Sequence, residues 1–419
     1  MVARAIHRPA VAAAARHWRS SRPRSGAALS AVAPPAAEVE ASAGATKPER
    51  RWVDFGRRVR LVDPAVELVD GSRWDVVCDV RSPGEYAEDH VPGALSTPVL
   101  DNDERKTVGT VYKQVNPFEA KKLGSALVAA NLGRIIESHF LDRPKETRVL
   151  VYCWRGGDRS QALAHTLSRI GFGEVALVER GYKGYRAQVK ARLDALGGFN
   201  VHVVAGQTGS AKGKLLESLR KAGGQVIDLE VCADHKGSVL GEELHANFEQ
   251  PSQKLFETRV AKAAMGLDPT RPLFVEGEGS LIGKCAVPQE LWAKMKVADV
   301  TEVHLPMEHR VAWLRSQYTH FETTHVGRLK EKLAVLVRKR GHATVDRWNE
   351  LVDAGRWDEF VEDMLVEHYD EVYAHAAERD RGQSPGKRCD VSLADLSDGE
   401  YDRAARDMLA QHDPAALGA

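Results

Sequence analysis

A single cysteine carries the strongest chemical signal in this chain. Cys153 follows the apolar run Val149–Tyr152 and precedes a stretch in which two glycines and two arginines occur within six residues. A helix is expected to begin just after this stretch, and the N–H groups at a helix start favour negative charge. These surroundings favour a reactive thiolate over an ordinary core thiol, so we predict that Cys153 is a catalytic nucleophile. The predicted anion pocket around it consists of Arg155, Gly156, Gly157 and Arg159.

A second candidate site lies farther along the chain, where a glycine-containing loop joins a predicted strand to a predicted helix. Residues 201–205 are strand-like, residues 206–212 read Gly-Gln-Thr-Gly-Ser-Ala-Lys, and a helical pattern follows from Leu215. This is the order of a phosphate-binding loop, in which backbone N–H groups and the lysine hold phosphates. A plain glycine turn before a helix is the alternative interpretation. The predicted phosphate-binding residues are Gly206, Thr208, Gly209 and Lys212.

Two positions depart from the phosphate-binding pattern G-x-x-x-x-G-K-[ST]. Ala211 replaces the second glycine, and Gly213 replaces the hydroxyl residue that would bind Mg²⁺. If position 211 requires a positive φ, alanine costs about 1 kcal/mol there. The backbone N–H groups and Lys212 depend on neither change, so phosphate binding is expected to survive better than metal-dependent hydrolysis. No metal site is predicted.

Strands that alternate with helices are expected to position Cys153. Strand-like segments at 74–80, 149–152 and 174–178 alternate with helical patterns at 123–140 and after Cys153. Such alternation predicts a parallel sheet with function at the carboxyl ends of its strands. Residues 101–105 form a dense polar cluster, which taken alone is typical of a solvated loop.

The second site is expected to lie on a similar α/β framework. Residues 225–230 and 272–276 are strand-like, whereas the polar segments 234–238 and 250–254 are interpreted as surface loops. Residues 326–340 form an amphipathic helix with a basic face. Such a face usually contacts solvent, but beside an active site it would bind RNA phosphates. The RNA-binding candidates are Arg338, Lys339 and Arg340.

Composition limits the classes of protein to which the chain can belong. The chain has 419 residues, 43% of them hydrophobic, which is enough for two soluble domains. Lys and Arg together number 59, as do Asp and Glu, so any RNA binding must come from local patches. The five cysteines include no C-x-x-C pair, which argues against a zinc site and a disulfide framework. No apolar run approaches the length of a membrane span, so no membrane partner is predicted.

Changes in composition divide the chain into four predicted segments. Residues 1–45 contain no acidic residue before Glu38, and six arginines fall within the first 24 positions. This is the pattern of a transit peptide for a chloroplast or mitochondrion, and a disordered tail without an address is the alternative. The remaining segments are a first α/β domain at 51–198, a phosphate-binding α/β domain with a helical C-terminal part at 199–380, and a peripheral segment at 381–419.

Several motifs in the first domain resemble those of a rhodanese domain, whose cysteine carries sulfur or selenium. They begin at Asp79, Glu85 and His90, read Asp-Val-Arg, Glu-Tyr and His-Val-Pro-Gly-Ala, and are followed by the strand-ending Cys153. The order of motifs along about residues 55–375 further resembles the tRNA 2-selenouridine synthase family. The additional motifs are residues 102–105, 108–110, 112–114, 153–160, 206–212, 234–238, 250–253 and 276–278.

The family resemblance implies a fold, a reaction and roles for the site residues. The fold is a rhodanese-like domain followed by a P-loop domain, and the enzyme is a transferase acting on the wobble 2-thiouridine of certain tRNAs. Selenophosphate supplies selenium, and the route passes through an S-geranylated intermediate made from geranyl diphosphate. Carried over by position, Cys153 is the catalytic cysteine and residues 206–212 bind phosphate. No tightly bound cofactor is predicted.

The same residues are also compatible with other classes of protein. The spacing Cys153-x₅-Arg159 is also the signature of cysteine phosphatases and rhodanese-fold arsenate reductases, in which the arginine clamps an oxyanion. Such enzymes need neither a second domain nor residues 102–105. Gly213 counts against a small-molecule kinase or NTPase, because the Mg²⁺-binding hydroxyl is missing. A tRNA-binding relic without chemistry would account for Ala211 and Gly213 together.

Overall fold

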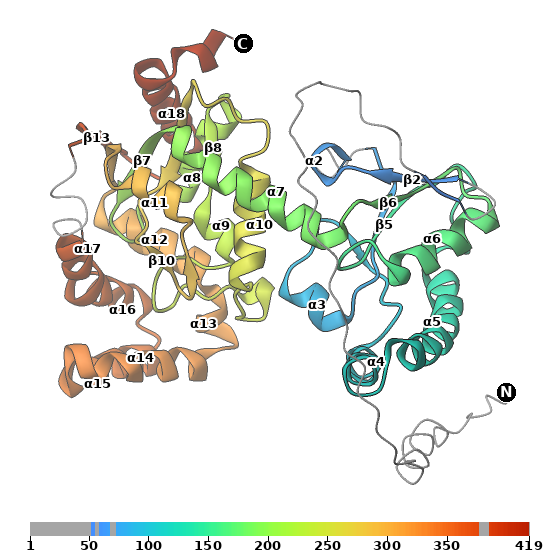
Figure 1. Cartoon of the computed structure of the whole chain (residues 1–419). Helices are drawn as coiled ribbons and strands as arrows, with labels where there is room; N and C mark the ends of the chain where they lie inside the picture. Colours follow the sequence, from blue (N-terminus) through green and yellow to red (C-terminus); the bar gives the residue numbers. More distant parts are fainter. Residues whose placement is uncertain (1–51, 55–57, 68–72, 377–384, 419) are drawn as a thin grey trace, which may run out of the picture. The chain divides into compact units, whose positions relative to one another are not determined.

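The computed structural model describes residues 52–54, 58–67, 73–376 and 385–418, which form two α/β domains, each built on its own sheet (Figure 1). This confirms the predicted fold class. It includes the predicted helical part toward the C-terminal end of the second domain. Residues 1–45 lie outside the described residues, so their organellar address stays a prediction. In the described ranges no helix is long and apolar enough to cross a membrane.

The first domain contains a six-stranded sheet in the order β1-β2-β6-β5-β3-β4. Only the β1–β2 pair is antiparallel, and the other neighbouring pairs are parallel. Its elements are β1 (Trp52–Asp54), β2 (Arg58–Val62), α2 (Pro64–Glu67), β3 (Val76–Asp79), α3 (Pro83–Glu88), β4 (Leu95–Ser96), α4 (Asn102–Gln114), α5 (Pro117–His139), β5 (Arg148–Tyr152), α6 (Asp158–Ile170), β6 (Glu174–Val178), α7 (Gly181–Ala195) and η1 (Leu196–Gly198).

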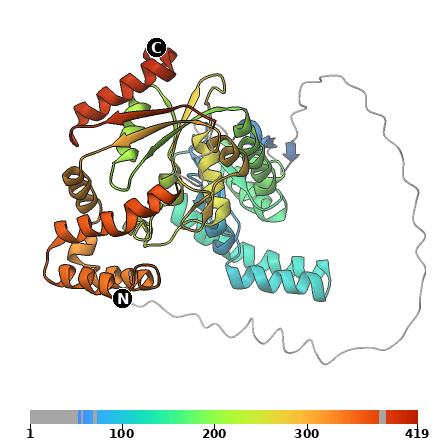
Figure 2. The same cartoon turned by 90° about the vertical axis from the view of Figure 1, so that its left-hand side faces the viewer.

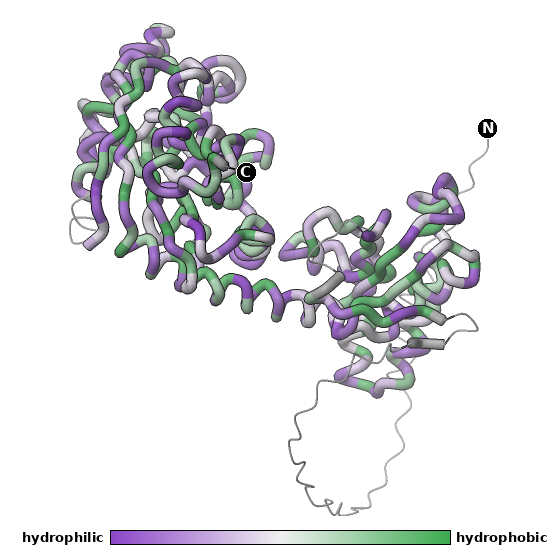
Figure 3. Tube along the Cα trace, turned by 90° about the horizontal axis from the view of Figure 1, so that it is seen from above, coloured by the Kyte–Doolittle hydropathy of each residue, from purple (hydrophilic) through white to green (hydrophobic). Residues whose placement is uncertain are grey.

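The central strand β5 is buried from Val149 to Tyr152, because helices cover both faces of a parallel sheet. Hydrophobic residues follow the strands, whereas hydrophobic and hydrophilic residues alternate along the helices (Figure 3). Leu163 and Leu167 of α6 are fully buried, and Gly171 ends that helix with a φ of 105°. The strand–loop–helix unit around Cys153 is therefore anchored on both sides of the loop.

The polar cluster at residues 101–105 begins a helix and is not a solvated loop. The Asp101 carboxylate accepts the Glu104 N–H at 2.8 Å, and the Glu104 carboxylate accepts the Asp101 N–H at 2.9 Å. This reciprocal capping satisfies two N–H groups that have no partner within the helix. The resulting α4 packs against the long helix α5 (Figure 2), and the Gly84 N–H donates to Asn102 Oδ1 at 2.9 Å, which joins α4 to α3.

The second domain contains a five-stranded parallel sheet in the order β13-β12-β7-β9-β8 and a small β10–β11 hairpin. Its elements are β7 (Asn200–Gly206), α8 (Lys212–Lys221), β8 (Gln225–Ile227), α9 (Leu229–Ala233), η2 (Leu244–Ala246), α10 (Gln253–Ala263), β9 (Pro272–Glu276), β10 (Leu281–Ile282), β11 (Cys285–Ala286), α11 (Gln289–Met295), β12 (Asp299–His304), α12 (Met307–Gln317), α13 (Thr319–Thr323), α14 (Val326–Arg340), α15 (His342–Asp353), α16 (Trp357–Met364), η3 (Leu365–Asp370), α17 (Glu371–Ala376), β13 (Arg388–Ser392), α18 (Asp398–His412) and η5 (Pro414–Gly418).

Two expectations for this domain are wrong. Residues 225–230 do not form one strand, because β8 stops at Ile227 and Asp228 caps a new helix, its carboxylate accepting the Val231 N–H at 2.8 Å. The C-terminal segment is not peripheral. Its strand β13 pairs with β12, and α18 packs against α8 through buried Tyr401 and Leu409. The sheet that carries the second site is therefore completed by the end of the chain.

Candidate active site

Cys153 lies immediately after β5, in the loop that leads into α6. Its side chain is only 3% exposed. The sulfur accepts the Gly157 N–H at 3.3 Å and the Ser160 hydroxyl at 3.2 Å. Both donors stand at the start of α6, so they are placed to stabilise negative charge on sulfur. Ser160 was not singled out from the sequence, although a hydroxyl in the first turn of the following helix is a recognisable signal.

The beginning of α7 holds the backbone of this loop in place. The Tyr182 N–H donates to the Cys153 carbonyl oxygen at 2.8 Å. A Cβ atom at Gly181 would lie 2.2 Å from that same oxygen, so only glycine permits the approach. Gly156 has a φ of 74°, a conformation that other residues rarely adopt. The position of the thiol is therefore set by backbone contacts from two directions.

The rhodanese-like motif at Asp79 supports α7 from inside the domain. Asp79 and Arg81 form a fully buried ion pair with an oxygen–nitrogen distance of 2.6 Å. The Arg81 guanidinium lies 4.0 Å from the centre of the Tyr182 ring, close enough for a cation–π contact. Because the Tyr182 N–H also donates to the Cys153 carbonyl oxygen, this motif helps to position the Cys153 loop by packing against Tyr182.

The two predicted pocket arginines lie in different environments. Arg159 forms two hydrogen bonds with the Glu85 carboxylate at 2.7 and 3.4 Å, and Arg105 approaches the same carboxylate at 3.8 Å. Burial opposes ionisation of Glu85, but the Arg159 contact lowers its pKa below the ordinary value. Arg155, in contrast, is exposed. An oxyanion clamp by Arg159, as in a phosphatase, would first require its separation from Glu85.

The predicted phosphate-binding loop connects β7 to α8. Gly206, Gly209 and Ala211 have φ angles of 157°, 84° and 55°, so position 211 does require a left-handed conformation. The estimated cost of about 1 kcal/mol for alanine at such a position therefore applies. Lys212 is the first residue of α8, and its Nζ donates to the Gly206 carbonyl at 3.0 Å. The loop thus curls around the lysine that would hold a phosphate.

Arg310 on α12 anchors this loop and was not predicted from the sequence. Its guanidinium donates to the Thr208 carbonyl at 2.9 Å and to the Gln207 side chain at 3.3 Å. Two further bonds, at 3.0 and 2.6 Å, join it to the Asp370 carboxylate. Arg310 is 3% exposed and Asp370 is half-buried, so this partly buried ion pair ties the loop to η3.

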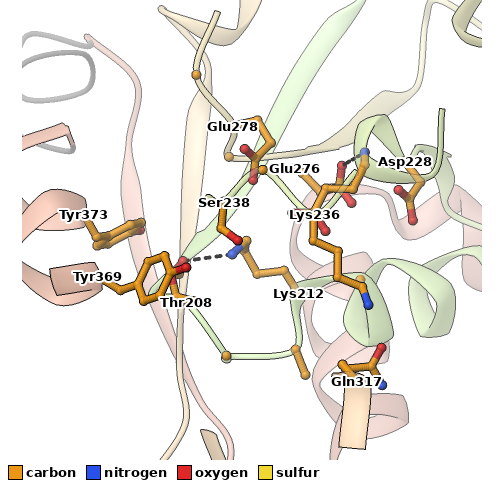
Figure 4. Close-up of a pocket in the computed structure, with 18 of the residues that line it drawn as sticks. Thr208, Lys212, Asp228, Lys236, Ser238, Glu276, Glu278, Gln317, Tyr369 and Tyr373 are labelled. Atoms are coloured by element: carbon orange, nitrogen blue, oxygen red, sulfur yellow. Dashed lines mark hydrogen bonds between the residues drawn. The ribbon is translucent and has the colours of Figure 1, made fainter. Parts of the chain in front are cut away.

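A cavity of about 870 Å³ opens in front of the loop. Figure 4 shows that Lys212, Lys236, Glu276 and Glu278 reach it from different elements. Asp228 and Glu230 also line it. Lys212 and Lys236 can hold an anionic ligand, and the carboxyl groups beside them can adjust the local charge by proton uptake.

The carboxylates in this cavity have separate functions. Glu276 Oε2 accepts the N–H groups of Leu229 and Glu230 at 2.7 and 3.0 Å, which caps α9. Burial and the neighbouring charges of Asp228 and Glu230 raise the pKa of Glu276 well above its ordinary value. Burial and the Glu278 charge likewise raise the pKa of Glu230 to about 8, although Lys212 opposes this shift. At neutral pH Glu230 is therefore mostly neutral, which lessens its repulsion of an anionic ligand.

The affinity of the cavity for diphosphate should fall as the pH rises from 7 to 9. Loss of the Glu230 proton near pH 8 places a negative charge beside Lys212 and the phosphate-binding loop. Glu230→Gln should remove this part of the pH dependence, so wild type and variant differ most at pH 9. Calorimetric titration with inorganic diphosphate measures the difference, and Glu217→Gln at the cavity rim is the control. Parallel pH profiles for wild type and Glu230→Gln would contradict the assignment.

The two polar segments interpreted as surface loops have structural roles. In the segment 234–238, Lys236, Gly237 and Ser238 line the cavity, and the Lys236 ammonium lies 4.8 Å from the Tyr318 ring centre. In the segment 250–254, the Gln250 side chain donates to the Ile282 carbonyl at 2.9 Å and braces the β10–β11 hairpin. The segment 234–238 therefore belongs to the lining of the cavity, whereas the segment 250–254 supports the β10–β11 hairpin.

The three RNA-binding candidates at the end of α14 differ in availability. Arg340 pairs with Glu371 and donates to His368 Nδ1 at 3.0 Å, so its guanidinium is held within the domain. Arg338 and Lys339 are exposed, and Lys339 also lines the large cavity. An RNA contact at this end of the helix, which stays a prediction, would therefore rest on Arg338 and Lys339.

Both domains are similar to described families. Residues 199–391 match the family described as tRNA 2-selenouridine synthase AAA domain, and residues 62–188 match the rhodanese-like domain. A tRNA 2-selenouridine synthase of Cronobacter sakazakii is 34% identical over 266 residues, which cover 61% of this chain and 67% of that protein. One from Hydrogenovibrio crunogenus is 29% identical over 362 residues, with 80% and 94% covered. For one from Chromohalobacter salexigens, 34% identical over 241 residues, the match spans 57% of this chain and 64% of that protein.

Proposed function

Because the chain belongs to the tRNA 2-selenouridine synthase family, we propose that it converts the wobble 2-thiouridine of tRNA to 2-selenouridine. Selenophosphate is the proposed selenium donor, and an S-geranylated base made from geranyl diphosphate is the proposed intermediate. The observation that carries this proposal is the presence in one chain of a hydrogen-bonded cysteine at a helix start and a phosphate-binding loop facing a large cavity. Two sites suited to anionic donors match two successive transfers.

The first proposed step is alkylation of the base sulfur. The sulfur forms a bond to the first carbon of the geranyl group while the carbon–oxygen bond to diphosphate breaks. Negative charge then grows on the diphosphate, where Lys212 and the loop N–H groups can stabilise it. This step needs no hydrolysis of a phosphate anhydride, so the absence of a hydroxyl at Gly213 does not oppose it.

The second proposed step exchanges sulfur for selenium. The selenium of selenophosphate bonds to the base carbon, geranyl thiol departs with its sulfur, and hydrolysis of the selenium–phosphorus bond releases phosphate. Prior alkylation helps because a thiol is a better leaving group than sulfide. We assign Cys153 to the cleavage of the selenium–phosphorus bond: its thiolate attacks phosphorus, selenium leaves on the base, and water then hydrolyses the S-phosphocysteine to phosphate and thiol. The sulfur lies among N–H and hydroxyl donors that also suit this phosphate group.

An apolar recess beside the loop supports a prenyl diphosphate as ligand. The recess shares Thr208, Ser238, Leu314, Tyr318 and Tyr369 with the large cavity, and the rest of its lining is mainly aliphatic and aromatic. Its volume is about 60 Å³, so side chains must move apart to admit a ten-carbon tail. An apolar space that opens directly from a phosphate-binding loop favours geranyl diphosphate over a nucleotide.

Leu314→Asn should weaken geranyl diphosphate binding about tenfold while leaving inorganic diphosphate binding nearly unchanged. Leu314 lines both the recess and the cavity, and a buried leucine side chain contributes about 1.5–3 kcal/mol through apolar contact. Calorimetric titration with each ligand separates the two effects. Val335→Asn, at an exposed apolar position on α14, is the matched control.

An equal loss for both ligands would show that Leu314 only supports the loop, because its Cδ1 lies about 3.1 Å from the Cβ position of Gly209. That result would place the prenyl tail elsewhere.

The proposed reaction is tested most directly by nucleoside mass spectrometry. Full-length protein is incubated with 2-thiouridine tRNA, selenophosphate and geranyl diphosphate, and the tRNA is then digested. We expect S-geranyl-2-thiouridine when selenophosphate is omitted and 2-selenouridine when both donors are present. Turnover of an aryl phosphate without any modified nucleoside would favour the phosphatase alternative, and tRNA binding without either activity would favour the relic.

A further inference from the structure

Two histidines and one cysteine meet in the second domain at a place that the proposed reaction does not use. His202 is on β7, Cys389 is on β13, and His412 is the last residue of α18. His202 precedes Gly206 by four residues, which places it about 13 Å back along the strand from the phosphate-binding loop. The cluster therefore lies toward the amino ends of the parallel strands, whereas the large cavity lies at their carboxyl ends.

The ligand-type atoms of these three residues are already close together. One nitrogen of each imidazole and the Cys389 sulfur all lie within 4.8 Å of one another. The Cys389 sulfur is 4.0 Å from His412 Nε2, and the two imidazole centres are 4.3 Å apart. Around a tetrahedral zinc ion with ordinary bond lengths, such atoms are about 3.3–3.6 Å apart. Small side-chain movements of at most about 1.5 Å would therefore complete a metal site.

The surroundings of the cluster favour coordination by a metal. His202 is 4% exposed, and Cys389 and His412 are half-buried, so few water molecules compete for their ligand atoms. The Thr301 hydroxyl lies 2.8 Å from His202 Nε2 and 3.1 Å from the Cys389 sulfur. Thr301 thus stands between two ligands and can orient them by hydrogen bonding, as residues around metal ligands commonly do.

The kinds of ligand select the kind of metal. One thiolate and two imidazoles suit Zn²⁺ and similar transition metals, whereas Mg²⁺ and Ca²⁺ require oxygen ligands. Three protein ligands leave one position for water. The ligands also come from a central strand, an edge strand and the last long helix, so a bound ion would join the C-terminal segment to the middle of the sheet.

We propose that His202, Cys389 and His412 form a Zn²⁺ site that fastens β13 and α18 to β7. The sequence argued against zinc because its cysteines form no local pairs, but that test does not detect ligands separated by nearly two hundred residues. A bound Zn²⁺ would also steady the phosphate-binding loop, because α18 packs against α8, the helix that begins with Lys212.

The test uses the full chain with Cys153→Ser, so that the reactive thiol does not bind the probe. Metal is removed with a chelator, and the protein is titrated with Zn²⁺ alone and, separately, with Co²⁺. We expect one equivalent of Zn²⁺ to bind and to raise the Tm. With Co²⁺ we expect the absorption bands of a tetrahedral ion with a thiolate ligand.

Variants of the ligands and of a neighbouring histidine make the test specific. Cys389→Ser and His412→Ala should each lose the stoichiometric binding and the rise in Tm, whereas His304→Ala on β12 should keep both. If a ligand variant does not fold, the Co²⁺ thiolate band of the parent protein still decides the question. Failure to bind one equivalent, a Co²⁺ spectrum without thiolate character, or unchanged binding by folded Cys389→Ser protein would each overturn the proposal.

Discussion

Cys153→Ser should lower the rate of 2-selenouridine formation roughly hundredfold or more while leaving S-geranylation of the tRNA intact. Serine preserves the size of the side chain and the bonds from Gly157 and Ser160, but an alcohol is rarely ionised near neutral pH and is a weak nucleophile. The geranyl step depends on the phosphate-binding loop and should continue, so the S-geranylated base should accumulate. Mass spectrometry of digested tRNA reports both products in one experiment.

Two further variants separate chemistry from folding. Ser160→Ala removes one hydrogen bond to the sulfur and should produce a smaller loss than Cys153→Ser. Cys78→Ala removes a buried thiol from β3 of the same domain and should retain the activity. Normal 2-selenouridine formation by Cys153→Ser protein would show that selenium transfer does not depend on this thiol, and equal losses in Cys78→Ala would indicate a folding defect.

Most elements that carry the two sites could be predicted because their signals are local. The strands at 174–178 and 272–276 match β6 and β9, since fully buried strands appear as uninterrupted apolar runs bounded by turn residues. The helix at 326–340 matches α14 because Leu329, Leu333 and Leu336 form its buried stripe.

The wrong expectations arose where the deciding partner is distant or the local signal is ambiguous. Helix α9 begins at Leu229 because Asp228 caps it and because Glu276, nearly fifty residues later, accepts the Leu229 N–H. Strand β13 contains alternating exposed and half-buried residues, as expected at a sheet edge, and its pairing with β12 depends on tertiary contacts. The capping box at Asp101 was present in the sequence, but its polar residues are equally common in loops.

In the candidate sites, too, the features set by local sequence could be predicted and those set by distant partners could not. The positions of Cys153 directly after a buried strand and of Lys212 at the start of a helix follow from strand–loop–helix order, which the sequence displays. The support from Arg310 could not be predicted, because about one hundred residues separate it from Thr208. The pairing of Arg159 with Glu85 was also hidden, since both residues carry charges that suit many other partners.

Lys212→Ala should weaken geranyl diphosphate binding roughly thirtyfold and reduce S-geranylation at least as strongly. The lysine is placed at the start of α8 inside the loop, and a hydrogen bond to a charged group contributes about 2 kcal/mol. Its effect on the reaction should be larger than on binding, because charge on the diphosphate increases as the carbon–oxygen bond breaks. Calorimetry and single-turnover geranylation measure these quantities separately.

Lys214→Ala is the matched control, because Lys214 pairs with Asp398 at 2.8 Å and lies 4.8 Å from the Tyr401 ring centre. It removes a lysine from the same helix without touching the loop lysine. Equal weakening by both variants would mean that general positive charge, and not Lys212, holds the diphosphate.

The double change Ala211→Gly with Gly213→Thr should preserve or tighten diphosphate binding, in contrast to Lys212→Ala. Glycine relieves the left-handed strain at position 211, which has a φ of 55°. A side chain at position 213 has room, since no atom lies within 4 Å of its Cβ position, and a threonine hydroxyl there can bind Mg²⁺.

Binding of geranyl diphosphate should remain tighter than binding of ATP, because the recess beside the loop is apolar. Tight Mg-ATP binding by the wild type, with no measurable affinity for geranyl diphosphate, would instead place this domain with the kinases and NTPases.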